Sequence, residues 1–256
     1  MIKIDKGSSP PNLTRTNTRR KRAMSDAYDG NPNNYINAID TFNFGSAYNT
    51  EEVRERLILK QHNKCCFSEA KFQGDYSDVE HFRPKGRVDD YVTNVSSYPG
   101  YYWLAYDWGN LFLCKTRPNT SQKRNYFPLY NEAMRNRCHT DTNVEDAKLI
   151  NPGNEEPRDF IRFHRDEPRS VDARARGQFN IDFFDLRHSE FAEGRRTRLK
   201  LLEVAKKLVD RLLSMGVPVD DPEIVESLDV LREAISPEAE YSSMAIDFLH
   251  GWAPLQ

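Results

Sequence analysis

The chain has 256 residues, enough for one large domain or for a core with a second lobe. Charged residues make up 30% and hydrophobic residues 38% of the chain, which is polar but too apolar for a disordered protein. The net charge of -2 excludes a global basic field, so binding of nucleic acid would need local basic patches.

Neither a membrane span nor a secretion signal is visible in the sequence. No uninterrupted apolar run approaches the roughly 20 residues that cross a bilayer, and the first residues lack the apolar centre of a signal peptide. Four cysteines stand at irregular spacing, unlike the frameworks of secreted disulfide proteins. We therefore expect a cytoplasmic protein with reduced thiols and no membrane partner.

Residues 1–63 are predicted to form an N-terminal arm followed by a helix. The basic run 14–22 favours a solvated helix start or arm, and contact with nucleic-acid phosphates is the alternative. Thr50 can cap a helix whose first turn holds Glu51 and Glu52 and which continues to about His62.

An acid stands beside a histidine at the end of a short apolar run, as Glu80 and His81. Pro84 cannot continue a helix and biases the residue before it toward extended backbone, so the pair is predicted at a strand end or on the loop leaving it. A carboxylate can hold a divalent metal, and a neutral imidazole can take a proton from water. The next cations, Arg83 and Lys85, can receive a phosphate. A solvated loop pair is the structural alternative for Glu–His taken alone.

Two further motifs follow along the chain. Asn110–Leu111 opens an apolar run, and Asn119 precedes Lys123 on a predicted short helix. With the Glu80–His81 pair, this set resembles the HNH endonucleases, which have a ββα-metal core.

The resemblance narrows to the PtuB-like HNH subunit of Septu-type antiphage systems and their retron-linked relatives. The motifs that carry it occur in order over most of residues 1–205. They are Ile4-x-Lys6-x3-Pro10, Glu80-His81-Phe82-Arg83-Pro84-Lys85, Asp107-Trp108-x-Asn110-Leu111, Phe127-Pro128, Leu149-Ile150-Asn151-Pro152 and Glu156-Pro157. Each motif is weak alone, but the ordered set is specific.

The resemblance implies metal-dependent hydrolysis of phosphodiester bonds in nucleic acid, with DNA favoured over RNA. His81 would be the general base that activates water, and Glu80 and Asn119 would bind a single Mg2+ or Mn2+ ion. Asn110 would be structural and would tie the loop that holds His81. Three cations would contact phosphates: Arg83, Lys85 and Lys123.

This sequence departs from the family in the spacing of the late motif. The family's late Asn usually stands three residues before its Lys, whereas Asn119 stands four before Lys123. Thr120 and Asn125 therefore remain open as alternatives for the metal-ligand position.

The second departure concerns a structural zinc held by two Cys-x-x-Cys pairs in the family. Ser68 and Arg117 stand where the second thiolate of each pair is expected, which leaves Cys65 and Cys114 as remnants. Structural Zn2+ is therefore expected to have been lost. Rescue stays open through three other residues: Cys66, Cys138 and His139. Without zinc, the core is expected to rest on aromatic packing by Phe67, Phe72, Trp103, Trp108, Phe112 and Tyr126.

Residues 131–256 are predicted to be mainly helical and to pack on the core. Residues 160–163 alternate like a strand. A long amphipathic helix is expected over residues 195–213, with Leu201, Val204, Leu208 and Leu212 on its apolar side and a solvated cationic face that includes Arg195. Gly216 would stop it, and helices over 222–235 and 237–250 would follow.

The predicted fold is α+β: a small ββα-metal (HNH) core at residues 64–130, embedded in a mainly α-helical protein. The resemblance also implies a partner, an ABC- or SMC-like ATPase of the same defence system. Two other functions stay open. One is a catalytically inactive HNH-fold subunit that binds nucleic acid or protein, and the other is a toxin nuclease that targets RNA.

Overall fold

The computed structural model describes residues 1–74, 78–115 and 123–255. Its α-helices are α1 (Pro11–Gly30), α2 (Pro32–Ile36), α3 (Glu51–Lys60), α4 (Arg176–Phe183), α5 (Ser189–Ser214), α6 (Pro222–Ala234) and α7 (Ser242–Phe248). Its strands are β1 (Asp78–His81), β2 (Val88–Asp89), β3 (Ser96–Ser97), β4 (Leu111–Cys114), β5 (Ile161–His164) and β6 (Glu167–Ser170).

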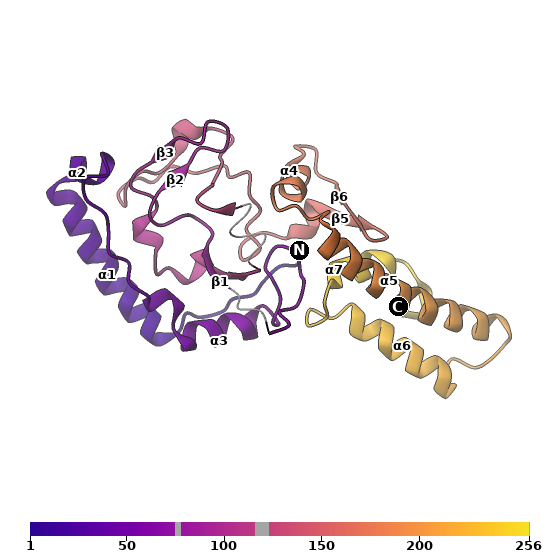
Figure 1. Cartoon of the computed structure of the whole chain (residues 1–256). Coiled ribbons are helices and arrows are strands. Elements are labelled where there is room, and N and C mark those ends of the chain that lie inside the picture. The colour runs from indigo at the N-terminus through magenta and orange to yellow at the C-terminus, as the bar shows by residue number, and fades with distance from the viewer. Residues whose placement is uncertain (75–77, 116–122, 256) are drawn as a thin grey trace.

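Among the described residues the strands form small antiparallel pairs, β1 with β4, β2 with β3, and β5 with β6. Figure 1 shows α1 and α3 along one edge of the strand-containing part, while α5 and α6 extend away from its other side. This mixture of helices with small sheets agrees with the predicted α+β class.

The main apolar core joins the N-terminal arm, the β1–β4 pair and α4. The aromatic residues expected to hold it are buried, except Tyr126, which is half-buried and packs against the cluster. A second cluster lies between the C-terminal helices and includes Phe191, Leu202 and Leu231. The helical region therefore has apolar packing of its own beside the main core.

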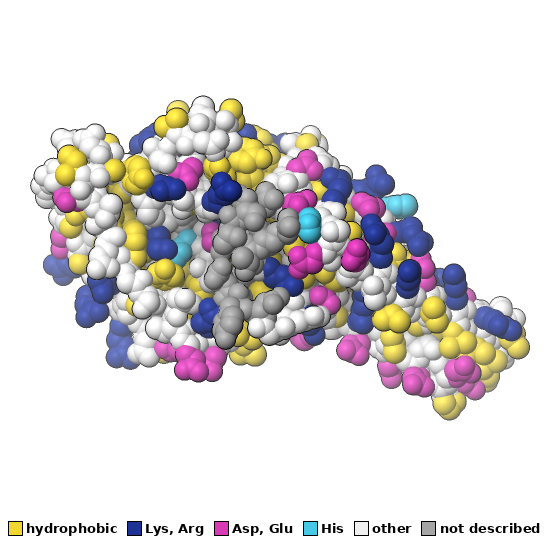
Figure 2. Space-filling view, in the orientation of Figure 1, with side chains coloured by type: hydrophobic (Ala, Val, Ile, Leu, Met, Phe, Trp, Pro, Cys, Tyr) yellow, Lys and Arg dark blue, Asp and Glu magenta, His cyan; other side chains and the backbone are white. Residues whose placement is uncertain are grey.

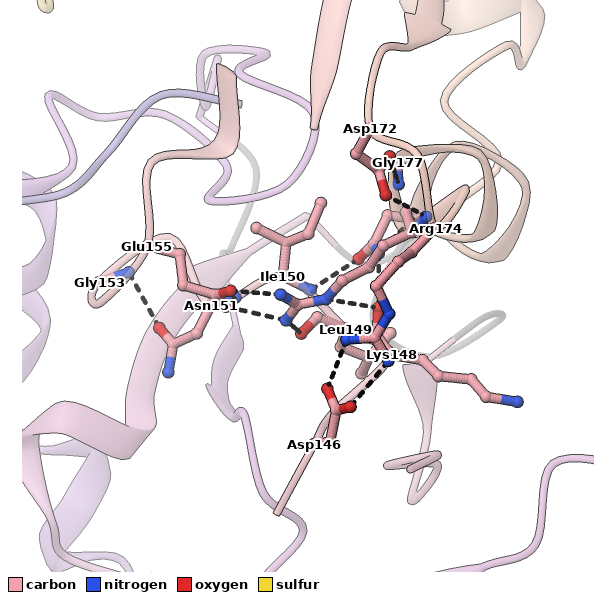
Figure 3. A network of polar contacts seen from close by, with 12 residues as sticks. Asp146, Lys148, Leu149, Ile150, Asn151, Gly153, Glu155, Asp172, Arg174 and Gly177 are labelled. Atoms are coloured by element: carbon pink, nitrogen blue, oxygen red, sulfur yellow. Dashed lines mark hydrogen bonds and ion pairs between the residues drawn. The ribbon is translucent and has the colours of Figure 1, made fainter. Parts of the chain in front are cut away.

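The stretch after Lys148 is fixed to α4 by the polar network of Figure 3. Arg176 pairs with Glu155 and donates from Nη2 to the Leu149 carbonyl at 2.6 Å. The Ile150 amide donates to the Asn180 side chain at 3.0 Å, and these buried bonds hold the chain against the helix. In the next turn, the Pro152 carbonyl accepts a hydrogen bond from the amide of Ile4 in the N-terminal arm at 2.7 Å.

Lys6 anchors the same arm to the segment that leads into β4. Its side chain is buried, and its ammonium donates to the carbonyls of Trp108 and Leu111. The ammonium also lies over the rings of Trp108 and Phe112, at 4.4 and 4.2 Å from their centroids. Burial lowers the pKa of Lys6 to about 7, against the opposing effect of Asp107.

Lys6→Met is expected to change how stability depends on pH. The folded-state pKa of about 7 lies below the unfolded value of 10.5. Between these values the unfolded chain therefore binds more protons, and the free energy of unfolding rises with pH. Between pH 7 and 9.5 the wild type should gain about 3 kcal/mol more than Lys6→Met.

Urea denaturation at several pH values measures this difference. Lys3→Met is the matched control, because Lys3 is an exposed lysine of the same arm. It should keep the wild-type pH dependence, and identical pH curves for Lys6→Met and the wild type would contradict the burial argument.

Several local predictions in the helices and strands are confirmed. Thr50 caps α3 by accepting from the Val53 amide, and Asp221 caps α6 by accepting from the Glu223 amide at 3.0 Å. Gly216 has φ +79° just beyond the end of α5. Strand β5 covers the alternating run, whereas α7 is shorter than the helix expected over 237–250.

The predicted orientation of the long helix α5 is wrong. Leu201 and Val204 are 57% and 67% exposed, whereas Leu202 and Val209 are buried. Arg195, expected on the solvated face, is 2% exposed and donates to the carbonyls of Asp166 and Leu186. The helix has two apolar stripes, and contact with α6 and α7 buries the stripe that includes Leu202 instead of the predicted one.

Buried polar contacts dock α7 on the segment before β1. Glu69 accepts from the amide of Ser243 at 3.1 Å and from the hydroxyl of Ser242 at 3.2 Å. Lys64 donates to the Ala239 carbonyl at 2.8 Å.

Across the described ranges, no helix combines the length and the apolar character needed to cross a membrane.

Candidate active site

The pairing of β1 with β4 positions Glu80 and His81. His81 stands opposite Leu111 and Glu80 opposite Phe112, and every residue of β4 is buried. The Phe82 amide donates to the Asn110 carbonyl at 2.8 Å, which continues the pairing beyond β1. The acid and the histidine therefore end a strand, as predicted, and rest on a buried apolar partner.

Asn110 clamps the loop that leaves β1. Its Oδ1 accepts from the amide of Arg83 at 2.7 Å, and its Nδ2 donates to the carbonyls of Arg83 and Leu104 at 3.0 and 3.1 Å. The side chain is 4% exposed, so these bonds satisfy a buried amide. The geometry matches the structural role expected for this residue.

The contacts of His81 define its tautomer. Nε2 lies 2.9 Å from the Ala105 carbonyl, which can only accept, so Nε2 carries the hydrogen. Nδ1 then presents its lone pair and lies 3.4 Å from the Lys85 ammonium. The Tyr48 ring packs edge-on against the imidazole, with centroids 4.7 Å apart.

The electrostatic surroundings keep His81 neutral. Burial, followed by the nearby Lys85 ammonium, lowers the pKa of His81 from 6.5 to about 3. The imidazole is 5% exposed, so water does little to offset the cost of a buried charge. At neutral pH this side chain is a fixed, uncharged proton acceptor.

Lys85→Met is expected to raise the pKa of His81, because the variant removes a positive charge that disfavours the imidazolium. The value should stay below 6.5, since burial is the larger cause. Titration of the histidine ring signals by NMR measures it. Lys207→Met, an exposed change on α5, should leave the His81 titration unaltered, and an unaltered titration in Lys85→Met would contradict the contact.

Glu80 is ion-paired with Lys123 rather than open to solvent. The Lys123 ammonium lies 2.6 Å from Oε1 of Glu80 and donates to the His81 carbonyl at 2.7 Å. The lysine side chain is 0% exposed and that of Glu80 12%. Lys123 was expected to contact a phosphate, but its buried ammonium instead joins the acid to the backbone of β1.

Arg83 also has an internal partner. Its Nε lies 2.9 Å from Oε2 of Glu145, whose other oxygen accepts from the Tyr101 hydroxyl at 2.7 Å. The Arg83 side chain is 27% exposed and Glu145 is nearly buried. Of the cations expected at a phosphate, Lys85 is the one whose ammonium lies beside the imidazole ring of His81.

The expected second metal ligand is not among the described residues. Asn119 and Thr120 both lie outside them. Asn125 is described, and its Nδ2 donates to Asp89 at 3.2 Å. Within residues 1–74, 78–115 and 123–255, no group of three or more His, Cys, Asp or Glu side chains could hold a metal ion.

The two expected zinc remnants lie together. The sulfurs of Cys65 and Cys114 are 3.7 Å apart, both side chains are buried, and the Lys115 amide donates to the Cys65 sulfur at 3.4 Å. Burial raises the pKa of the Cys65 thiol, but hydrogen bonds from Cys114, Cys66 and Ser68 outweigh it and lower that pKa. Arg117 lies outside the described residues, so loss of zinc stays a prediction.

The basic run of the N-terminal arm lies within α1, not at a helix start. Leu13, Met24 and Tyr28 of this helix are buried. Lysine and arginine side chains gather along its outer edge in Figure 2. The exposed ones are Arg15, Arg19, Lys21 and Arg22.

Sequence reasoning missed Tyr48 and the Ala105 carbonyl, which hold the imidazole. Neither belongs to a pattern that a sequence reveals, because Tyr48 reaches His81 from a separate short 3-10 helix, Ala47–Asn49, before α3.

Comparison with curated proteins finds a relative of this chain. The chain is 32% identical over 175 residues to Septu protein PtuB of Bacillus mycoides (strain KBAB4). The match covers 67% of this chain and 59% of that protein, so the chain spans less than two thirds of its relative's length. No protein-family model matches the chain, and no solved structure matches it. The similarity supports the Septu-type relationship that the ordered motifs predict.

Proposed function

We propose that this chain is a metal-dependent HNH endonuclease that hydrolyses phosphodiester bonds in nucleic acid, with DNA favoured over RNA. The observation that carries the proposal is the state of His81. A buried histidine whose Nε2–H is bound to the Ala105 carbonyl is held neutral, with Nδ1 turned to Lys85. The similarity to Septu protein PtuB supports the Septu-type relationship, and the ordered motifs of that relationship imply the HNH chemistry.

In the proposed reaction Nδ1 of His81 takes a proton from water, and the water oxygen bonds to phosphorus while the bond to the leaving oxygen breaks. The Ala105 carbonyl keeps the ring oriented and stabilises the imidazolium that forms. A base with a pKa near 3 is weak. A phosphate that attracts the Lys85 ammonium would take it off Nδ1 and raise the pKa of His81.

The chemistry of Glu80 fits a divalent cation. Its carboxylate offers hard oxygen ligands, and an ion bound at Oε1 would have to displace the Lys123 ammonium from that oxygen. Glu80 and Asn119 would hold the Mg2+ or Mn2+ ion, which would stabilise negative charge on the leaving oxygen.

Cleavage assays test the proposal. Purified wild type and His81→Ala would be incubated with plasmid, linear DNA and RNA, with Mg2+ or Mn2+ and with a chelator. We expect the wild type to cleave in the presence of the metal and not with the chelator, and we expect His81→Ala not to cleave under either condition. Equal cleavage by both proteins would refute the role of His81, and cleavage of RNA alone would favour the RNA-targeting nuclease.

The proposed setting is an antiphage defence system in which an ABC- or SMC-like ATPase holds and gates this chain. The relationship to Septu protein PtuB supports a role in Septu-type defence, and the ATPase is the finer part of the proposal. Co-expression with the product of a neighbouring ATPase gene tests it, since the two proteins should purify together. Failure to associate would remove the ATPase from the proposal.

A non-catalytic binding subunit is the second candidate, and the Glu80–Lys123 pair favours it. An ammonium bound to the acid does in part what a metal would do there, because it neutralises the carboxylate. On this alternative, His81→Ala and the wild type bind nucleic acid or a protein equally, and neither cleaves.

A further inference from the structure

A cavity of about 390 Å³ lies beside the His81 site and has no role in the reaction described above. Half-buried aromatic rings, Tyr35, Phe42, Phe44 and Tyr98, share its wall with four polar side chains: Asp40, Thr41, Arg87 and Asn125. Some of these rings are already ordered by stacking, since Tyr35 and Phe42 lie 4.2 Å apart at 7°. Phe42 also stacks on Tyr102, with centroids 4.4 Å apart, so its faces are covered within the protein, and Phe44 is the wall ring beside Lys85.

The cavity is continuous with the site through two short segments. Lys85 contacts His81, and the next two residues, Gly86 and Arg87, line the cavity. The Phe44 ring lies 5.7 Å from the Lys85 ammonium. The loop of Phe44 then continues to Tyr48, which packs on the imidazole. The Lys85 ammonium thus lies between the two features, 3.4 Å from Nδ1 of His81 and 5.7 Å from the centre of the Phe44 ring.

We propose that this cavity binds a nucleobase of the strand cut at His81, which makes an unpaired or single-stranded nucleotide the substrate of the site. The inference rests on the proposed nuclease function. Aromatic faces stack on any base, so binding would not depend on base sequence. Arg87 and Asn125 bond Asp89 through Nε and Nδ2, and their other hydrogen-bonding groups would meet the edge of the base. The volume lies in the range of small-molecule pockets. With Lys85 on the phosphate, the flanking base falls toward Phe44.

Binding of matched oligonucleotides to the full-length His81→Ala protein tests the assignment. The probes are a fluorescent single-stranded DNA and the same strand with abasic sites, which keeps the phosphates but removes the bases. Phe44→Leu preserves apolar volume but removes a ring. We expect it to weaken binding of the normal strand about 5- to 100-fold and to leave binding of the abasic strand unchanged. Phe44→Tyr should bind both probes like the parent.

The control variant is Tyr130→Leu, which removes a partly exposed ring at 39% exposure outside the cavity. It should bind both probes like the parent, and equal thermal midpoints will show that the variants are folded. The inference is overturned if Phe44→Leu weakens both probes equally or neither. Loss of partner association in Phe44→Leu with unchanged DNA binding would instead assign the cavity to a protein segment. Absence of any nucleic-acid binding by the parent would refute the proposed function itself.

Discussion

His81→Ala is expected to lower the rate of phosphodiester cleavage by about 10²- to 10⁴-fold, the usual contribution of a general base. The imidazole is neutral and oriented before substrate arrives, because Ala105 fixes one nitrogen and Tyr48 packs against the ring. Alanine removes the proton acceptor without adding charge or bulk. Single-turnover cleavage at saturating protein measures the chemical step apart from binding.

His62→Ala is the matched control for this loss. His62 is a surface histidine whose Nδ1 lies 3.6 Å from the exposed Glu238. Its replacement should leave the cleavage rate within about twofold of the wild type, as expected for a surface change. A fall of similar size in both variants would point to loss of folded protein, and circular dichroism of each sample separates that outcome from loss of the base.

Local signals account for what the sequence predicted correctly. Three signals each determine the backbone of the few residues around them: the capping Thr50, the Pro84 that follows the Glu80–His81 pair, and the Gly216 at a helix end. The start of α3, the strand end at His81 and the end of α5 therefore appear where the sequence places them. The ordered motifs likewise predict that Asn110 ties the loop that holds the histidine, and its side chain hydrogen-bonds the backbone of Arg83 in that loop.

What the sequence does not reveal are partners that lie far away along the chain. Arg83 pairs with Glu145, which stands 62 residues later, and its expected contact with a phosphate stays a prediction. The face of α5 that is buried is chosen by α6 and α7, not by α5 itself. A sequence pattern indicates which residue types suit a role, but it does not predict which buried charged side chains form ion pairs with each other.

Lys123→Met should have the largest effect on stability. It removes the ammonium that joins Glu80 to the His81 carbonyl, and it leaves a carboxylate that is 12% exposed without this cation. Breaking a buried pair costs about 3–5 kcal/mol, and we expect about 3 kcal/mol because Glu80 retains some access to water. Urea denaturation of both proteins at pH 7 measures the difference.

A second substitution distinguishes the stability lost through the Glu80 charge from the stability lost through packing of the Lys123 side chain. Adding Glu80→Gln to Lys123→Met removes the charge of the carboxylate that lost its ammonium, so the double variant should recover part of the lost stability. Lys206→Met is the control, since Lys206 pairs with Asp210 at 2.7 Å on the exposed surface of α5, where such pairs contribute at most about 1 kcal/mol. If Lys123→Met costs no more than Lys206→Met, the ammonium does not hold Glu80 beside His81. The pair would then carry no argument for the non-catalytic alternative, since the pairing of β1 with β4, and not the ammonium, would position Glu80.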